Sequence, residues 1–284
     1  MYGLLIVAAL LIAFQFMFNQ QFRKCNGEGL DSTLKFSLYT NAFSCVIMLA
    51  LGKFQYRVTW FSLLIAFFYA IVLILFSYAS LKSLATANLS VFSIFTMLGS
   101  ILLPTAYGFI FCEEEITTAK IICIALIIVS TALTFEKGNG KSGGAGNIKN
   151  YIAVFILNGL VGVLSKMHQY NTELSVDSNS FMATVNAFCV VMCIICLLVK
   201  NKKLPGINKQ EFKALAGYAG SNGVGNLFAL IALKELPASV HFPILTGGVM
   251  TFSTLISFLR KEKPSAKTVL SVIIAIIATV LIMF

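Results

Sequence analysis

Hydrophobic residues along this chain fall into long runs that are separated by short polar breaks. A helix that crosses a bilayer needs about 20 mostly apolar residues. Ten runs of suitable length can be counted, at residues 2–22, 32–51, 59–81, 86–111, 117–135, 150–171, 178–199, 211–233, 238–259 and 264–283. The pattern therefore predicts an all-α integral membrane protein with ten transmembrane helices.

The longest break between these runs is rich in glycine and divides the runs into two sets of five. Residues 136–149 read Glu-Lys-Gly-Asn-Gly-Lys-Ser-Gly-Gly-Ala-Gly-Asn-Ile-Lys, which is typical of a flexible linker. The linker separates one five-helix repeat, residues 1–135, from a second, residues 150–284. Because five is odd, the second repeat enters the membrane from the opposite side, which makes the two repeats inverted.

Short stretches of the two halves also resemble each other. Residues 81–88 read Leu-Lys-Ser-Leu-Ala-Thr-Ala-Asn, and residues 233–240 read Leu-Lys-Glu-Leu-Pro-Ala-Ser-Val. Asn41-Ala42-Phe43 lies within a run of the first half, and Asn186-Ala187-Phe188 lies within a run of the second. Membrane proteins with internal repeats of this kind are commonly transporters, and their substrate site lies where the halves meet.

The composition agrees with a membrane protein and changes the meaning of its charge. The chain is 58% hydrophobic and 11% charged, whereas a soluble domain carries about 25% charged residues. The net charge of +10 is therefore assigned to loops beside lipid headgroups, and nucleic acid is not an expected partner. The first run lacks a charged leader and a cleavage site, so we expect a retained span.

Glutamates stand at the junction of the fourth and fifth runs of each half. The junctions read Glu114-Glu115-Ile116-Thr117 and Glu262-Lys263-Pro264-Ser265, and they follow apolar stretches that begin at Phe92 and Phe242. Two matching five-helix halves with these glutamates resemble the drug/metabolite transporter superfamily, of the ten-helix EamA type. The stretch from Phe92 to Glu114 is two residues longer than its counterpart, so we expect a bulge or kink near Pro104.

The resemblance implies a central cavity near the bilayer midplane and transport of small metabolites, amino acids, drugs or sugar derivatives. It also implies a multi-pass protein of the plasma (inner) membrane with both termini in the cytoplasm. The distribution of Lys and Arg indicates the reverse orientation, because one side of the predicted topology collects 16 of them and the other only 5. The positive-inside rule places the richer side in the cytoplasm and both termini outside, so the orientation stays open.

Neutral polar residues within the runs are the candidates for substrate binding. Tyr218, Asn222 and Asn226 are four residues apart and therefore share one face of the eighth run, which is also rich in glycine. Three large polar groups on one face exceed what packing needs, so we predict that they line a cavity. The alternative is that the asparagines bond neighbouring helices.

Further neutral candidates are spread over other runs. Asn41 and Asn186 are related by the repeat, and they either face the substrate or join the two halves. The remaining binding candidates are Thr96, Thr246, Gln15, Asn19 and Asn158. Gly247 and Gly248 follow Thr246 directly, and we expect them to have a structural or gating role.

Acidic residues are absent from the centres of the runs, which argues against an exchanger that binds protons or cations at a central carboxylate. Glu113, Glu114, Glu115 and Glu262 are expected at helix ends within reach of water. A capping or solvating role is favoured for them over a gating role.

Basic residues at the ends of the runs have two interpretations. Lys82 and Lys234 are expected to extend toward the headgroups, but one of them could instead recognise an anionic or phosphorylated substrate. Lys166, His168 and His241 are treated in the same way, as satisfied polar groups and not as a proton relay.

No motif indicates a metal site, a cofactor or an enzyme. Cys189, Cys193 and Cys196 share one face of a run, but one helix cannot complete a tetrahedral thiolate site. Phosphate-binding glycine loops and the common hydrolase and metalloprotease motifs are missing from the sequence.

The sequence therefore predicts a secondary or facilitative transporter of a small neutral or zwitterionic metabolite, such as an amino acid, an amine or a drug-like solute. Alternating access is the expected mechanism and export the expected direction. A fused repeat needs no dimer, so we expect a monomer whose partners are its substrate and the bilayer. Two alternatives stay open, an anion carrier that uses Lys82 or Lys234 and a non-transporting assembly partner or sensor.

Overall fold

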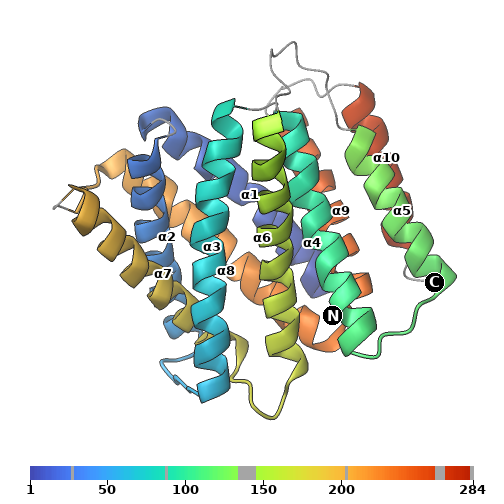
Figure 1. Ribbon diagram of the computed structural model, residues 1–284, viewed down its shortest axis with the longest axis horizontal. Coiled ribbons are helices and arrows are strands. Elements are labelled where there is room, and N and C mark those ends of the chain that lie inside the picture. The colour runs from blue at the N-terminus through green and yellow to red at the C-terminus, as the bar shows by residue number, and fades with distance from the viewer. Residues whose placement is uncertain (27–28, 87–88, 134–144, 202–203, 260–265, 282–284) are drawn as a thin grey trace.

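The structure is a computed structural model that describes residues 1–284 except 27–28, 87–88, 134–144, 202–203, 260–265 and 282–284 (Figure 1). Over these residues the chain forms ten helices and no strands, which confirms the predicted fold class. The helices are α1 (Tyr2–Asn26), α2 (Leu30–Leu51), α3 (Trp60–Thr86), α4 (Leu89–Phe111), α5 (Thr118–Leu133), α6 (Ala145–Tyr170), α7 (Ser178–Asn201), α8 (Lys209–Glu235), α9 (Ala238–Leu259) and α10 (Ala266–Leu281).

Six of the helices are long and apolar enough over their described residues to cross a membrane, namely α1, α2, α3, α6, α7 and α9. Helices α4, α5 and α10 each contain a shorter apolar segment. Helix α8 belongs to neither group, because Tyr218, Asn222, Asn226 and several glycines lower its hydropathy. Large apolar side chains such as Trp60 and Leu259 point outward, as expected for a surface in contact with lipid.

The helices form two layers of five, which can be followed in Figure 1. The front layer contains, in spatial order, α7, α3, α6, α4 and α5. The back layer contains, in the same order, α2, α8, α1, α9 and α10. The layers contact each other at their edges, through α2 with α7 and α5 with α10, and also through α4 with α9.

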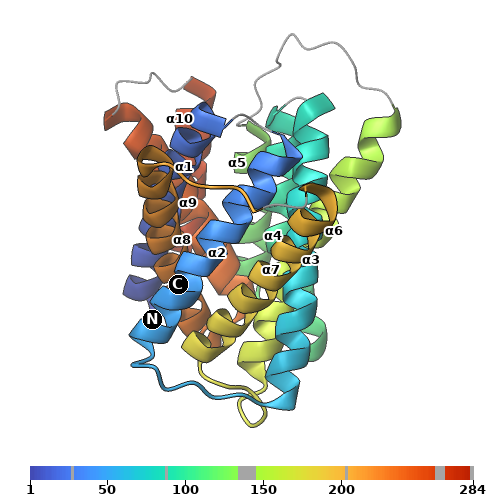
Figure 2. The ribbon, with the colours of Figure 1, turned by 90° about the vertical axis from the view of Figure 1, so that its left-hand side faces the viewer.

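The helix contacts are consistent with two related halves. Exchanging α1 with α6, α2 with α7, α3 with α8, α4 with α9 and α5 with α10 converts the front layer into the back layer and reproduces the main contacts. Helices α1 and α6 begin at opposite ends of the bundle (Figure 2). We call the end at which α1 begins the terminal end, because α10 also runs toward it.

Close helix approach in the front layer depends on glycine. Gly99 of α4 lies so near α6 that an added Cβ would be 2.1 Å from the carbonyl oxygen of Phe155. A Cβ on Gly162 would be 2.3 Å from Cγ of Pro104, which lies inside α4 without ending the helix. Small residues at such contacts let two membrane helices pack backbone against backbone.

We predict that Gly99→Ala destabilises the fold, because the new methyl group meets backbone and cannot be accommodated by a side-chain movement. Overpacking of this kind costs about 1–3 kcal/mol. Thermal unfolding of the purified protein should show a lower midpoint. Gly220→Ala in α8 is the matched control, because no atom lies within 4 Å of its added Cβ. Equal midpoints for the two variants would contradict the close packing of α4 on α6.

Candidate functional site

The polar stripe of α8 lies on a face of the helix that is buried above and below it. Leu215, Ala229 and Leu233 continue the helical spacing of Tyr218, Asn222 and Asn226 above and below, and they are 0%, 6% and 2% exposed. Tyr218, Asn222 and Asn226 are only half-buried. The interior face of α8 is therefore closed at both ends and partly accessible in its middle, where the polar side chains lie.

Gln15 of α1 lies at the same level as this stripe. Gly217 of α8 packs on Phe18 and Gly225 packs on Ile12, so the two helices are in register over this stretch. Gln15 lies between Ile12 and Phe18 on the same face of α1. Its Oε1 is buried and has no hydrogen-bond partner. Asn19, one turn further along α1, is half-buried.

Asn41 belongs to α2 and Asn186 to α7, two helices whose contact the exchange of halves maps onto itself. Asn41 donates its amide N–H to the carbonyl of Ser37 in its own helix, at 2.6 Å. Asn186 is 5% exposed, and its Nδ2 has no hydrogen-bond partner. A buried amide donor without a partner is costly unless a ligand or water accepts its hydrogen bond. Asn186 is therefore the stronger candidate of the pair.

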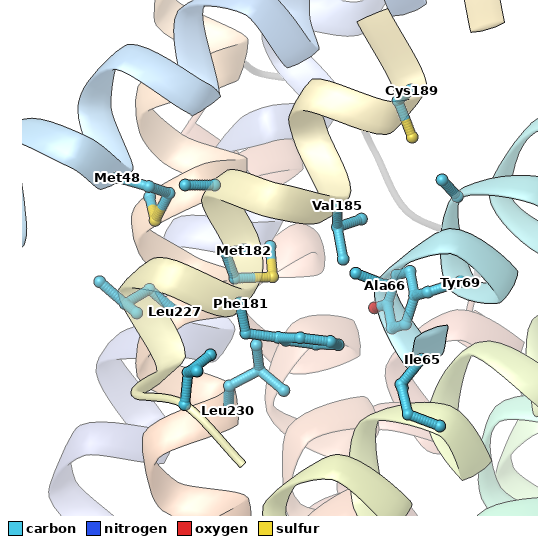
Figure 3. Packing of buried hydrophobic residues seen from close by; sticks show 13 residues of the cluster. Met48, Ile65, Ala66, Tyr69, Phe181, Met182, Val185, Cys189, Leu227 and Leu230 are labelled. Carbon is cyan, nitrogen blue, oxygen red and sulfur yellow. The ribbon is translucent and has the colours of Figure 1, made fainter. Parts of the chain in front are cut away.

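A hydrophobic cluster borders this polar region toward the terminal end. Met48 of α2, Tyr69 of α3, Phe181 of α7 and Leu227 and Leu230 of α8 pack together (Figure 3). The cluster joins both layers, and it begins directly after Asn226 along α8. Along α8 it therefore lies between the polar stripe and the terminal end of the bundle.

Three of the predicted binding residues lie elsewhere in the bundle. Asn158 of α6 donates its amide N–H to the carbonyl of Thr96 in α4, at 2.7 Å. This bond serves the packing of α4 on α6, which is the alternative that the sequence left open for asparagines. Thr246 of α9 is half-buried beside the buried Gly247, and Gly248 packs closely on Ala9 of α1. A binding role for Thr96, Asn158 and Thr246 stays a prediction.

Glu114 makes several polar contacts at the terminal end. Its carboxylate accepts hydrogen bonds from the backbone N–H groups of Ala238 and Ser239, at 2.6 and 3.1 Å, and from the Ser239 hydroxyl, at 2.8 Å. It also pairs with the Lys166 ammonium at 3.1 Å. Glu114 thus caps the first turn of α9, where unpaired N–H groups and the helix dipole favour an anion.

Glu114 caps a helix that is distant in the chain and not one at its own junction, and its predicted exposure to water is wrong. The side chain of Glu114 is 6% exposed and that of Lys166 is 7% exposed. Gly108 makes the burial possible, because an added Cβ there would be 2.7 Å from the carboxylate carbon. Glu113 and Glu115 are exposed as expected, and Glu262 lies outside the described residues.

The surroundings of Glu114 keep its carboxylate charged. Burial on its own would raise the pKa of the carboxyl, but the hydrogen bonds from Ala238 and Ser239 and the charge of Lys166 together outweigh burial. The pKa of Glu114 therefore lies below its ordinary value.

The remaining basic candidates are divided among several environments. Lys234 is exposed at the terminal end, in a pocket of about 160 Å³ that Asp177 also lines, and the side chain of Lys82 lies outside the described residues. His168 is satisfied, because Ser62 and Gln169 bond its two ring nitrogens at 3.0 Å each. His241 is buried and its Nδ1 has no partner, which differs from the satisfied state expected for it.

We predict that Glu114→Gln lowers the free energy of unfolding by about 3 kcal/mol, because removing one charge of a buried pair leaves the other uncompensated. Thermal or denaturant unfolding in detergent would measure the loss. Asp31→Asn is the matched control, because it breaks an ion pair with Lys200 whose side chains are 57% and 44% exposed. Such a pair contributes under about 1 kcal/mol. An equal effect of the two substitutions would contradict the burial of Glu114.

The lowered pKa of Glu114 predicts a dependence of stability on pH. A carboxyl with a depressed pKa in the folded state stabilises the fold above its unfolded pKa, and the effect is lost as the pH falls through the folded pKa. The unfolding midpoint of the wild type should therefore fall more steeply under acidic conditions than that of Glu114→Gln. Parallel pH curves for the two proteins would contradict the prediction.

Comparison with known proteins identifies the second half of the chain. Residues 148–284 match the EamA-like transporter family. No curated protein matches the sequence. One solved structure, described only as the crystal structure of a protein, superposes with a TM-score of 0.79 and 12% sequence identity, and the alignment covers 98% of this chain and 94% of that one. At this identity the likeness concerns the fold.

The family match, the helical fold and the apolar helices agree with the resemblance seen in the sequence. The chain contains an EamA-like transporter family domain at residues 148–284, and its long apolar helices are those of a multi-pass membrane protein.

Proposed function

We propose that the protein carries a small neutral or zwitterionic solute across the membrane by alternating access. The observation that carries this proposal is the partly accessible polar stripe of Tyr218, Asn222 and Asn226 on an otherwise buried face of α8. Its side chains can exchange hydrogen bonds with a solute without leaving the interior of the bundle.

The chemistry of the proposed site favours a solute without net charge. Gln15, Asn41, Asn186, Asn222 and Asn226 offer amide donors and acceptors but no charge. A solute with a net charge would lose its hydration there without gaining a counterion, which is costly in a medium of low dielectric constant. A zwitterion presents opposite charges that partly compensate each other, and an uncharged amine or drug-like solute has no such cost.

The arrangement of the helices supports alternating access. The relation between the halves exchanges the two layers, so a packing that is closed at one end of the bundle has a rotation-related counterpart that is closed at the other end. We propose a monomer in the plasma (inner) membrane, with export as the direction. The anion carrier gains no support from Lys234, because this lysine is exposed beside Asp177 and away from the stripe.

The first test is a thermal-shift screen of the purified protein against amino acids, quaternary amines, nucleosides and sugar phosphates. A ligand that binds the folded state raises its apparent stability with concentration. We predict that the effective ligand is neutral or zwitterionic. A sugar phosphate as the effective ligand would instead favour the anion carrier.

With that ligand, we predict that the double variant Asn222→Ala/Asn226→Ala binds roughly 30-fold more weakly, because two hydrogen bonds of about 1 kcal/mol each are removed. Ser221→Ala is the control, because Ser221 is in the same turn but on another face of α8. Flux into liposomes should fall in parallel. Normal affinity and flux in a well-folded double variant would overturn the assignment of the stripe.

A further inference from the structure

We infer that Glu114 is a latch between the two layers, and that its release opens the interior of the bundle toward the terminal end. The inference rests on the proposed transport function. Glu114 would set the equilibrium between the closed and open arrangements at this end. The proposed binding residues do not have this role.

The contacts of Glu114 cross from one layer to the other. Glu114 belongs to the connection between α4 and α5 in the front layer, whereas Ala238 and Ser239 begin α9 in the back layer. Lys166 of α6 in the front layer pairs with Glu114 and also contacts the carbonyl oxygen of Leu236, just before α9, at 3.4 Å. One carboxylate and one ammonium therefore hold the start of α9 against the front layer.

The cap of α9 differs in kind from the cap of α8. Helix α8 is capped locally, because the side chain of Asn208 accepts from Glu211 N–H and the Glu211 carboxylate accepts from Asn208 N–H. The residue before α9 is Pro237, which has no side-chain oxygen to act as a cap. The carboxylate that replaces it comes from 124 residues away in the chain. A cap of this kind adds to the cohesion of the layers, whereas a local cap does not.

The backbone around Glu114 is shaped for this contact. The N–H of Glu114 bonds the carbonyl of Gly108 at 3.2 Å, and Glu113 has a φ of 53°, a conformation that non-glycine residues rarely adopt. The absence of a side chain at Gly108 leaves room for the carboxylate. A backbone conformation of this kind is strained, and it persists only where the surrounding contacts enforce it.

Release of the contact would be a discrete event. Hydrogen bonds and ion pairs depend on direction and distance, so a small separation of the layers breaks all of the Glu114 contacts together. Water that enters the gap then solvates the start of α9, Glu114 and Lys166. The neighbouring hydrophobic cluster around Phe181 and Leu230 has no such directional requirement. Loss of the Glu114 contacts, and not a change in the hydrophobic cluster, therefore shifts the populations of the closed and open arrangements.

The test measures a distance across the latch by spin labels at Thr172, between α6 and α7 in the front layer, and at Glu235, the last residue of α8 in the back layer. Both positions are exposed. The exposed cysteines, Cys25 and Cys196, are first replaced by serine. Loss of a charged hydrogen bond corresponds to a population change of about 10-fold or more. Glu114→Gln should therefore increase the population at longer distance by about that factor, without any ligand.

Two further variants keep the outcome clear. Ser239→Ala removes one of the three hydrogen bonds to the carboxylate and should give a smaller shift in the same direction, even if Glu114→Gln folds poorly. Asp31→Asn breaks the exposed pair with Lys200 and should leave the distances unchanged. Distances in folded Glu114→Gln and Ser239→Ala that equal those of the wild type would overturn the latch.

The two hypotheses fail separately. If the variants shift the distance but no ligand tested is transported, the latch is supported and the proposed transport function is contradicted. Flux by the wild type with no shift in either variant removes the latch and leaves the proposed function intact.

Discussion

A bilayer offers no water to the peptide backbone, and this constraint governs the architecture of the protein. Within a helix each N–H and C=O group is paired locally, but the first N–H groups and the last C=O groups need partners from elsewhere. The start of α8 meets this need with its own Asn208 and Glu211. The start of α9 meets it with Glu114 of the other layer, so that the same requirement that forms the helices also holds the layers together.

The second consequence of the bilayer is that polar side chains gather inside the bundle and must be matched there. Most of them are: Asn158 bonds α4, His168 is bonded through both ring nitrogens, and Lys166 is paired. Gln15 and Asn186 each keep an unpaired buried amide atom. An unpaired buried amide is expected where a solute or water completes the hydrogen bonding, and Gln15 lies level with the stripe of α8.

The sequence predicts the helices well, because long apolar runs and short polar breaks follow directly from the thickness of the bilayer. It also predicts the shared face of Tyr218, Asn222 and Asn226, because that depends only on the helical period. The burial of Glu114 could not be predicted in this way. It depends on the space left by Gly108 and on the start of α9, which is 124 residues distant, and one sequence carries no signal for such a contact. The hydrogen bond from Asn158 to Thr96 of α4 could not be predicted either, because the two residues are also distant in the chain.

The order of the helices in the back layer also bears on how the protein is made. Helix α1 precedes the other described helices in the chain and is synthesised before them, yet its neighbours in the layer are α8 and α9. The face of α1 that carries Ala8, Ile12 and Gln15 therefore lacks its partner helix until α8, with Gly217 and Gly225, has been inserted into the membrane. Contacts between such distant segments form slowly. Assembly of the back layer is consequently a late step of biogenesis, and a chain that stops before α8 would leave α1 without its main contacts.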